Sequence, residues 1–119
     1  MPGERGFPKA LRLTRRREFL LLQREGRRRH SEAFVVLRHP AGGSTSRLGI
    51  TVSSRVGNAV ARNRVKRLVR EFFRTRRHEL RAAVDLVVIA KPGAPKLSYA
   101  QAANELARAL DLDLEPAPR

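Results

Sequence analysis

The chain contains no cysteine, which excludes disulfide scaffolds, thiol nucleophiles and cysteine-ligated metal sites. No hydrophobic run approaches the roughly 20 residues that a membrane-spanning helix needs, and the N-terminus lacks the apolar segment of a secretory signal. Aromatic residues make up only 5% of the sequence, and 11 Asp and Glu stand against 26 Lys and Arg. These absences favour a small, soluble and very basic protein, which we expect to be cytoplasmic.

The composition also limits the kind of fold. With 119 residues, of which 41% are hydrophobic, the chain is long enough for one domain with a buried core and too apolar for a disordered basic tail. Its formal net charge is +15, and most of its basic residues are arginines. Arginine binds phosphate through a planar guanidinium group with five donors. The composition therefore predicts a polyanion as the partner.

The positive charge is concentrated in two parts of the chain. Residues 1–30 carry a net charge of +7 and residues 55–81 a net charge of +8, whereas the remainder is close to neutral. A charge that served only solubility would be spread more evenly along the sequence. We therefore expect the two basic blocks to mark binding surfaces.

Hydrophobic periodicity and turn residues predict the order helix, strand, strand, helix, strand, helix. Thr14 and Ser98 are placed to cap the first and last helices, and Gly26 is placed to end the first. The expected elements are a helix over residues 15–25, a basic loop over 27–30, a strand over 34–37, its hairpin partner over 47–53, a helix over 58–78, a strand over 85–90 and a helix over 99–110.

This order predicts a single α+β domain, in the form of a compact two-layer α/β sandwich with a mixed sheet and about three helices. Pro and Gly are frequent near the N-terminus, so we expect residues 1–13 to form a flexible basic arm. The domain then spans residues 14–113, and residues 114–119 form a frayed tail.

The helix predicted over residues 58–78 separates apolar from basic side chains. At about 100° per residue, Val65, Leu68 and Phe72 share a stripe that faces the core. Like charges on the other side destabilise an isolated helix, whereas a bound polyanion turns their repulsion into attraction. A merely solvated face normally mixes Glu with Lys, so polyanion binding is the favoured interpretation. The basic and amide side chains on or beside that face are Arg62, Asn63, Arg64, Lys66, Arg67, Arg70 and Arg74.

Two features near this face have more than one interpretation. Asn63 can hydrogen-bond a base edge or a ribose hydroxyl, or it can be a neutral spacer. Gly57 can form a positive-φ turn before the helix, and the free N–H groups at the helix start can receive a phosphate or simply belong to a turn. The sequence has no phosphate-binding loop of the G-x-x-x-x-G-K-[ST] type.

The segment GNAVARNRVKRLVREF, at residues 57–72, has a distinctive order of glycine, asparagine and basic residues. With Arg62-Asn63-Arg64 followed by Lys66-Arg67 and Arg70, it closely resembles the signature of the protein subunit of bacterial ribonuclease P. A short basic motif alone would be weak evidence, but the similarity extends over residues 11–110. It includes Arg17-Glu18-Phe19, Phe34-Val35-Val36-Leu37, Arg47-Leu48-Gly49 and Asp85-Leu86-Val87-Val88-Ile89-Ala90.

The resemblance implies a fold and a function. The family fold is an α/β sandwich with an unusual left-handed βαβ crossover. The implied function is to assist the catalytic RNA of ribonuclease P in removing the 5′ leader from precursor tRNA. The RNA subunit and its Mg²⁺ ions would perform the phosphodiester hydrolysis. The protein would be an RNA-binding accessory subunit of this endoribonuclease, as a monomer in a 1:1 ribonucleoprotein.

The resemblance also implies two binding sites. A cleft between the first helix and the sheet would hold the leader, although Phe19, beside three leucines, is also consistent with a core residue. The candidate leader-binding residues are Arg15, Arg16, Phe19 and Phe34. The residues implied to bind the RNA subunit are Arg55, Arg62, Asn63, Arg64, Lys66, Arg67, Arg70 and Arg74.

The chain departs from the family pattern at three places. Ser54-Arg55 stands where the family often has two lysines, and Gln23 and Leu37 stand where aromatic residues are common. With so few aromatics, we expect leader binding to depend more on charge and aliphatic surface than on stacking.

No catalytic or metal site is evident within the chain. The acidic residues near the basic blocks are surrounded by arginines, which lower the pKa of a carboxyl group and disfavour a general acid. His30, His39 and His78 are far apart in the sequence, and neither Ser53 nor Ser54 has an adjacent base. We therefore expect no catalytic residue, bound metal or cofactor in the protein itself, with Mg²⁺ held by the RNA partner.

Two other functions suit a small, arginine-rich protein. A structural ribosomal protein that binds rRNA has a similar size, charge and architecture, and it is the alternative. A membrane-active protein fits less well, because the basic helix face has a globular core behind it and does not belong to a free amphipathic helix.

Overall fold

The computed structural model describes residues 8–112; residues 1–7 of the predicted arm and the predicted tail lie outside the described residues. Within this range the α+β class, with a mixed sheet and three α-helices, is confirmed. The helices are α1 (Arg16–Glu25), α2 (Ala59–Arg76) and α3 (Tyr99–Ala109), and the strands are β1 (Arg27–His30), β2 (Phe34–Pro40), β3 (Arg47–Thr51) and β4 (Val84–Ala90). Short 3₁₀ turns lie at Lys9–Leu11, Ser54–Val56, Arg77–Glu79 and Ala94–Lys96.

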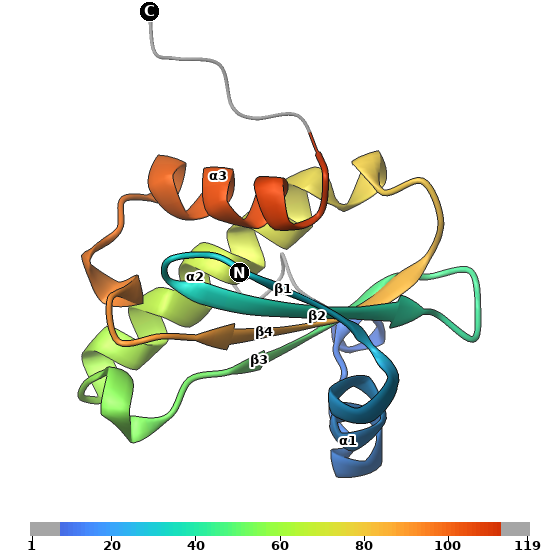
Figure 1. The fold of residues 1–119 in the computed structure, drawn as a ribbon, viewed down its shortest axis with the longest axis horizontal. Coiled ribbons are helices and arrows are strands. Elements are labelled where there is room, and N and C mark those ends of the chain that lie inside the picture. The colour runs from blue at the N-terminus through green and yellow to red at the C-terminus, as the bar shows by residue number, and fades with distance from the viewer. Residues whose placement is uncertain (1–7, 113–119) are drawn as a thin grey trace, which may run out of the picture.

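The strands form one sheet in the order β1-β2-β4-β3 (Figure 1). β1 pairs antiparallel with β2, β2 pairs antiparallel with β4, and β3 pairs parallel with β4. The predicted hairpin between β2 and β3 is wrong, because β4 lies between them. The continuous apolar run of β4 needs cover on both faces and a neighbour on each edge, and the centre of the sheet provides both.

The segment Arg27–His30, predicted as a basic loop, is the edge strand β1. It follows α1 directly and pairs with β2, from Arg27 opposite Arg38 to His30 opposite Val35. An edge strand tolerates charged side chains, because much of its surface faces water. The prediction missed this strand because its arginines show no hydrophobic alternation.

α2 connects the parallel neighbours β3 and β4 and so forms the expected βαβ unit; the hand of the crossover stays a prediction. Gly57 and Asn58 set the entry into α2. Gly57 has a φ of 156°, and a Cβ there would lie 2.9 Å from the Cβ of Ala61, so a larger residue does not fit. The Asn58 side-chain oxygen accepts a hydrogen bond from the Ala61 N–H at 2.9 Å and caps the helix.

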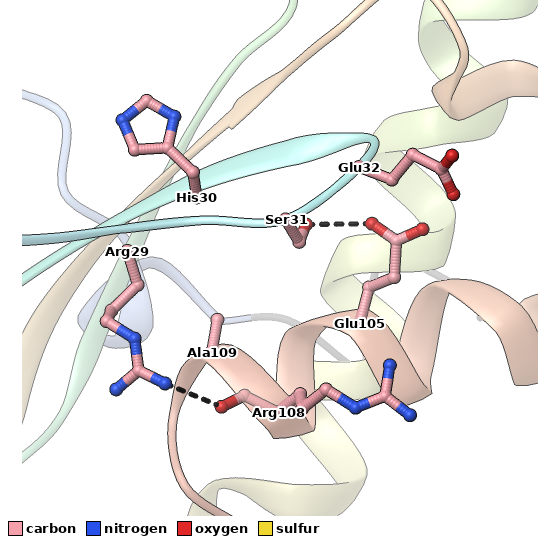
Figure 2. A pocket seen from close by; sticks show the side chains of 7 residues that line it. All are labelled: Arg29, His30, Ser31, Glu32, Glu105, Arg108 and Ala109. Atoms are coloured by element: carbon pink, nitrogen blue, oxygen red, sulfur yellow. Dashed lines mark hydrogen bonds between the residues drawn. The ribbon is translucent and has the colours of Figure 1, made fainter.

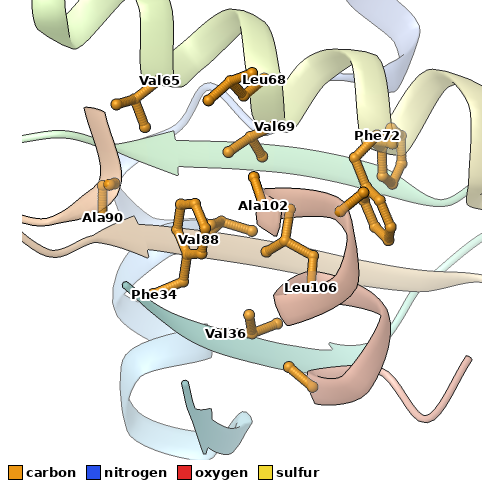
Figure 3. Close-up of a cluster of buried hydrophobic side chains, with 14 of the residues drawn as sticks. Phe34, Val36, Val65, Leu68, Val69, Phe72, Val88, Ala90, Ala102 and Leu106 are labelled. Carbon is orange, nitrogen blue, oxygen red and sulfur yellow. The ribbon is translucent and has the colours of Figure 1, made fainter. Parts of the chain in front are cut away.

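α2 and α3 cover one face of the sheet and enclose the main core (Figures 1 and 3). The apolar stripe of α2 that the sequence predicts is buried there, which leaves the basic side of the helix toward solvent. The labelled core residues of Figure 3 come from β2, β4, α2 and α3: Phe34, Val36, Val65, Leu68, Val69, Phe72, Val88, Ala90, Ala102 and Leu106.

α1 lies on the opposite face of the sheet, where a second, smaller core cluster forms (Figure 1). β2 and β4 bury side chains on both faces because their apolar residues are consecutive and do not alternate with polar ones. Gly49 of β3 lets α1 approach closely, since a Cβ at this position would lie 2.5 Å from Cζ of Phe19. The buried members of this cluster are Leu13, Leu22, Val35, Leu37 and Val87.

Residues 8–13, which the sequence places in the arm, contact the folded domain. Leu11 and Leu13 are buried, and the Leu13 N–H donates a hydrogen bond to the Leu48 carbonyl at 2.9 Å. This segment therefore contributes to both core clusters.

The ends of the helices follow local chemistry closely. α1 begins after Arg15 and not after Thr14, and the Glu18 carboxylate accepts a hydrogen bond from the Arg15 backbone N–H at 3.4 Å. α3 begins as predicted at Ser98, whose hydroxyl oxygen accepts from the Gln101 N–H at 3.1 Å. The cap predicted at Ser98 is therefore confirmed, whereas the cap predicted at Thr14 is wrong because α1 begins one residue later.

Candidate nucleic-acid interface

α2 presents a basic face to solvent, opposite the stripe that packs on the sheet. We define the basic face by the seven predicted residues from Arg62 to Arg74. Arg55 is also exposed, in the 3₁₀ turn that precedes the helix. Of the seven, Asn63, Arg64, Arg67, Arg70 and Arg74 are exposed, and Arg62 and Lys66 are half-buried.

Arg64 forms hydrogen bonds within the protein. Its Nε donates to the Pro95 carbonyl at 3.1 Å, and its Nη2 donates to the Leu97 carbonyl at 2.8 Å. These bonds satisfy two backbone acceptors in the segment before α3 and hold the guanidinium group against it. Arg64 therefore fixes α2 to this segment, and only its other N–H groups are left for a ligand.

Arg74 lies at the far end of the basic face and pairs with Glu71. Its Nε and Nη2 donate to the two carboxylate oxygens of Glu71 at 3.1 and 2.6 Å, and this hydrogen bonding raises the pKa of Arg74. Glu71 therefore neutralises part of the charge there. The strongest positive charge lies nearer the start of the helix, from Arg62 to Arg70.

Arg12 joins the basic face from outside α2, and sequence reasoning missed it. Partial burial lowers the pKa of Arg70, and the positive charge of nearby Arg12 lowers it further. Arg12 is held in place by its β-bridge to Leu48 of β3. Two neighbouring guanidinium groups favour a bound anion. The local sequence carries no signal for this pair, because the contact depends on a bridge between distant segments.

Arg62 contains a donor without an acceptor. Its Nε is buried and has no hydrogen-bond partner within residues 8–112. A buried polar atom that lacks a partner costs free energy. A ligand oxygen that reached this nitrogen would remove that cost, so Arg62 is suited to an anionic ligand.

The four residues predicted for the leader cleft do not lie together. Arg15 and Arg16 are exposed at the start of α1, and Phe19 is half-buried where α1 contacts the sheet. Phe34 has no exposed surface and lies in the main core, on the face opposite α1, so its assignment to the cleft is wrong. Successive side chains of a strand point to opposite faces, and it is Val35 that points toward α1.

The strand register arranges the side chains of the α1 face in three rows across the sheet. The first row is Arg47, Asp85 and His39; the second is Gly49, Val87, Leu37 and Arg28; the third is Thr51, Ile89, Val35 and His30. α1 contacts the first two rows, through Glu18 on Arg47 and Phe19 over Gly49. In the third row Thr51 and His30 are exposed and Ile89 is half-buried.

Ion pairs hold α1 along the first row. Arg47 donates to the Asp85 carboxylate through Nε at 3.1 Å and Nη2 at 3.0 Å, and its Nη1 lies 2.9 Å from Oε2 of Glu18. Burial raises the pKa of Glu18, but hydrogen bonds, led by that from Arg47, lower it by more. Near the other end of α1, Glu25 Oε1 lies 3.9 Å from His39 Nε2. Both acids of α1 therefore face the first row.

A cavity of about 220 Å³ lies between the β1–β2 turn and α3 (Figure 2). Glu105 Oε1 accepts hydrogen bonds from the Ser31 hydroxyl at 2.7 Å and the Ala33 N–H at 2.8 Å, which ties the turn to α3. The lining carries both signs of charge: Arg29, His30, Ser31, Glu32, Glu105, Arg108 and Ala109. This cavity therefore lacks the one-sided charge of the basic face.

Residues 8–112 contain neither a cluster of metal ligands nor a membrane-spanning helix. No three His, Asp or Glu side chains gather there as ligands for a metal ion. None of the helices in that range combines the length and the hydropathy that crossing a membrane requires.

The family model and the most similar relatives name the same family. A family model described as Ribonuclease P matches residues 7–112. The ribonuclease P protein component of Citrifermentans bemidjiense is 46% identical over 103 residues, which cover 87% of this chain and 88% of the relative. That of Desulfatibacillum aliphaticivorans is 48% identical over 89 residues, or 75% of each chain.

Solved structures agree with the sequence matches. The RNase P protein of Staphylococcus aureus has a TM-score of 0.79 at 34% identity, covering 87% of this chain and 94% of its own. That of Thermotoga maritima has a TM-score of 0.75 at 37% identity, covering 83% and 94%. These matches favour this family over the ribosomal alternative. The chain therefore belongs to the ribonuclease P protein family and is an accessory protein subunit of this tRNA-processing endoribonuclease.

Proposed function

We propose that the chain binds the RNA subunit of ribonuclease P through the basic face of α2 and holds the 5′ leader of precursor tRNA against the α1 face of the sheet. In this role it is a monomer in a 1:1 ribonucleoprotein of the cytoplasm. The RNA subunit and its Mg²⁺ ions hydrolyse the phosphodiester bond, and the protein improves substrate affinity and the use of metal ions.

The one-sided charge of α2 is the observation that carries this proposal. The helix cannot turn its cations away from a partner, because Val65, Val69 and Phe73 on its other side are nearly inaccessible in the main core. The backbone positions of the basic residues are therefore fixed relative to one another before RNA arrives. A preorganised backbone lowers the entropy cost of binding, and each neutralised phosphate releases counterions.

The chemistry of this face suits structured RNA. An A-form helix offers phosphates and 2′-hydroxyls over a wide, shallow minor groove, while its major groove is too deep and narrow for side chains to read. Arg67 and Arg70 supply charge for phosphates, and the exposed amide of Asn63 can donate to and accept from a 2′-hydroxyl. The buried Nε of Arg62 gains an acceptor if RNA oxygen reaches it.

The α1 face offers a second surface, which suits single-stranded RNA. Its centre is aliphatic, from Val35 and Ile89, and Phe19 is packed close to the backbone of Gly49. The ring of Phe19 is therefore only partly available for stacking. This agrees with the expectation that charge and aliphatic surface hold the leader.

The proposal is tested by cleavage of precursor tRNA by the cognate RNA subunit, with and without the protein, over a range of Mg²⁺ concentrations. At low Mg²⁺ we expect the protein to raise kcat/KM by about tenfold or more, equivalent to about 1.4 kcal/mol of transition-state stabilisation. The stimulation should shrink as Mg²⁺ rises. A protein that binds the RNA subunit but gives no stimulation at any Mg²⁺ concentration would overturn the proposal.

A further inference from the structure

Val60, in the first turn of α2, is the most exposed large hydrophobic residue among residues 8–112, with 76% of its surface accessible. The other exposed large hydrophobic residue in that range, Leu20 of α1, retains 44%. Val60 belongs to neither core cluster. A single apolar residue on a protein surface is common, so the surroundings of Val60 decide what it can do.

Val60 lies at the start of the basic face of α2. At about 100° per residue it is about 180° around the helix from Val69, which is buried in the main core. Asn63, Arg64 and Arg67 follow within about 60° of it on the same side of the helix. From Asn63 onward, every exposed residue of α2 is charged or carries an amide. A small apolar surface is therefore bordered by hydrogen-bond donors and positive charge.

The fold does not require a valine at this position. Alanine is a better helix former than β-branched valine, and a side chain as exposed as that of Val60 gains little from burial. The Asn58 cap and the Gly57 turn set the start of α2, and their contacts are with Ala61. The apolar surface of Val60 is therefore available to a partner without cost to the fold.

The charges around Val60 favour a nucleic acid as that partner. Arg64 and Arg67 attract an anionic surface and repel a basic one. Insertion into a membrane needs a broad apolar face on the helix, whereas the apolar stripe of α2 is covered by the main core. The partner must combine negative charge with accessible apolar surface, and the faces of nucleic-acid bases supply that surface.

The apolar contact also selects among RNA structures. In a regular double helix the base faces are covered by stacking, and the minor groove displays hydroxyl groups. Bases in loops and bulges are unstacked, so that their faces are accessible. Arg64 is held beside Val60 by its hydrogen bonds to the carbonyls of Pro95 and Leu97. Val60 therefore offers a supported apolar surface that fits an unstacked base.

We propose that Val60 packs on the face of one unstacked base of the RNA subunit, while Asn63 and Arg67 bind the polar groups of the adjoining backbone. This inference rests on the proposed function, in which the basic face of α2 contacts that RNA. Burial of apolar surface does not depend on released counterions, whereas phosphate contacts weaken as salt rises. Val60 thus adds a salt-independent affinity for RNA that presents such a base, and none for a plain duplex.

The test uses Val60→Ala and Val60→Thr. The first removes both methyl groups, and the second keeps the β-branched shape but replaces one methyl group by a hydroxyl. Leu20→Ala is the control, because it removes exposed apolar surface from α1, on the opposite face of the sheet (Figure 1). Affinity of each full-length protein for the RNA subunit and for a plain RNA duplex is measured at several salt concentrations. Thermal unfolding checks that each variant is folded.

We expect both Val60 variants to weaken binding to the RNA subunit by about three- to tenfold, the scale of one or two methyl groups removed from water. The slope of log affinity against log salt should stay unchanged. Binding to the duplex, and binding of Leu20→Ala to the RNA subunit, should match the native protein. Native affinity in either Val60 variant, a changed salt slope or an equal loss on the duplex would overturn the role of Val60.

Chemical probing of unpaired bases in the RNA subunit identifies the base. One base should be protected by the native protein and accessible again with either Val60 variant. An abasic nucleotide at that position should weaken binding of the native protein without weakening that of Val60→Ala further, whereas additive losses would contradict the contact. If Arg67→Ala also bound with native affinity and salt slope, the proposed function of the basic face would fail. A loss in Arg67→Ala beside native binding of the Val60 variants would remove only the present inference.

Discussion

The arginines of α2 have different partners, although they look alike in the sequence. Arg64 donates to backbone carbonyls, Arg74 pairs with Glu71, and Arg76 is buried with its Nε 2.6 Å from Glu79 Oε2. The sequence predicts correctly which side of the helix is basic, because that follows from periodicity alone. The sequence does not predict that Arg64 is hydrogen-bonded within the protein, because its acceptors, the carbonyls of Pro95 and Leu97, belong to a distant segment.

Arg67 tests the basic face at single-residue level. It is exposed in the middle of the face, so Arg67→Ala is expected to weaken binding to the RNA subunit and to lower the slope of log affinity against log salt by about 1. Arg81→Ala is the matched control, because it removes the same charge from an exposed position in the loop before β4. Titrations at several salt concentrations give both slopes. If the two variants behaved alike, net charge alone would govern binding.

Glu79 gives a prediction for acid stability. The hydrogen bond from Arg76 lowers the pKa of Glu79, so its ionised form stabilises the folded state. That contribution is complete above the ordinary pKa, near about 4.3, and is lost as pH falls through the lower folded value. Glu79→Gln should therefore reduce the free energy of unfolding at pH 7 by about 1–2 kcal/mol. Its stability should also fall less steeply than that of the native protein between about pH 5 and 3.

Glu71→Gln is the control for this prediction, measured by the same urea titrations at each pH. Glu71 and Arg74 have the same spacing as Glu79 and Arg76, but both of their side chains are nearly half-exposed. An exposed pair contributes little to stability, whereas Arg76 is buried and lies 5.7 Å from the centre of the Phe72 ring. Equal losses in the two variants would show that burial of Arg76 is irrelevant.

At the level of helices and strands, local patterns predict most of the fold. The central helix, the strand over 85–90 and the last helix all occur within about two residues of their predicted bounds, because periodicity and caps are local signals. β1 was missed because an edge strand made of arginines has no apolar pattern. Phe34 was misassigned to the leader cleft because its face depends on the pairing of β2, which the local sequence does not contain.

The close contact between Phe19 of α1 and Gly49 of β3 can be tested by substitution. In Gly49→Ala the new methyl group would lie 2.5 Å from Phe19 Cζ and 3.3 Å from Leu13 Cβ, so α1 or the ring must move. We expect a loss of about 1–3 kcal/mol in the free energy of unfolding. In a Phe19→Leu background the same substitution should cost less, because a smaller side chain faces the methyl group. Urea unfolding of the double-mutant cycle measures the coupling, and strictly additive losses would contradict this packing.

At the scale of the whole molecule, the order of the strands does not follow from local sequence signals. Two strands close in sequence were expected to pair as a hairpin, and instead a strand from the last third of the chain separates them. The sequence signals of a hairpin lie within a few residues of the turn. β3 and β4, in contrast, pair although the whole of α2 separates them in the sequence. The family prediction rests instead on the ordered resemblance across residues 11–110, which spans most of the chain and does not depend on strand pairing.

The central position of β4 has a consequence for how the protein is made. Translation delivers α2 before β4, so the apolar stripe of α2 leaves the ribosome before the strand that completes its core has emerged. The arginines on its other side are then attached to a helix that nothing holds in place, because tertiary packing stabilises most helices. A nascent chain therefore has the charge of the RNA-binding surface without its geometry. Correct docking on structured RNA must follow release of residues 84–90.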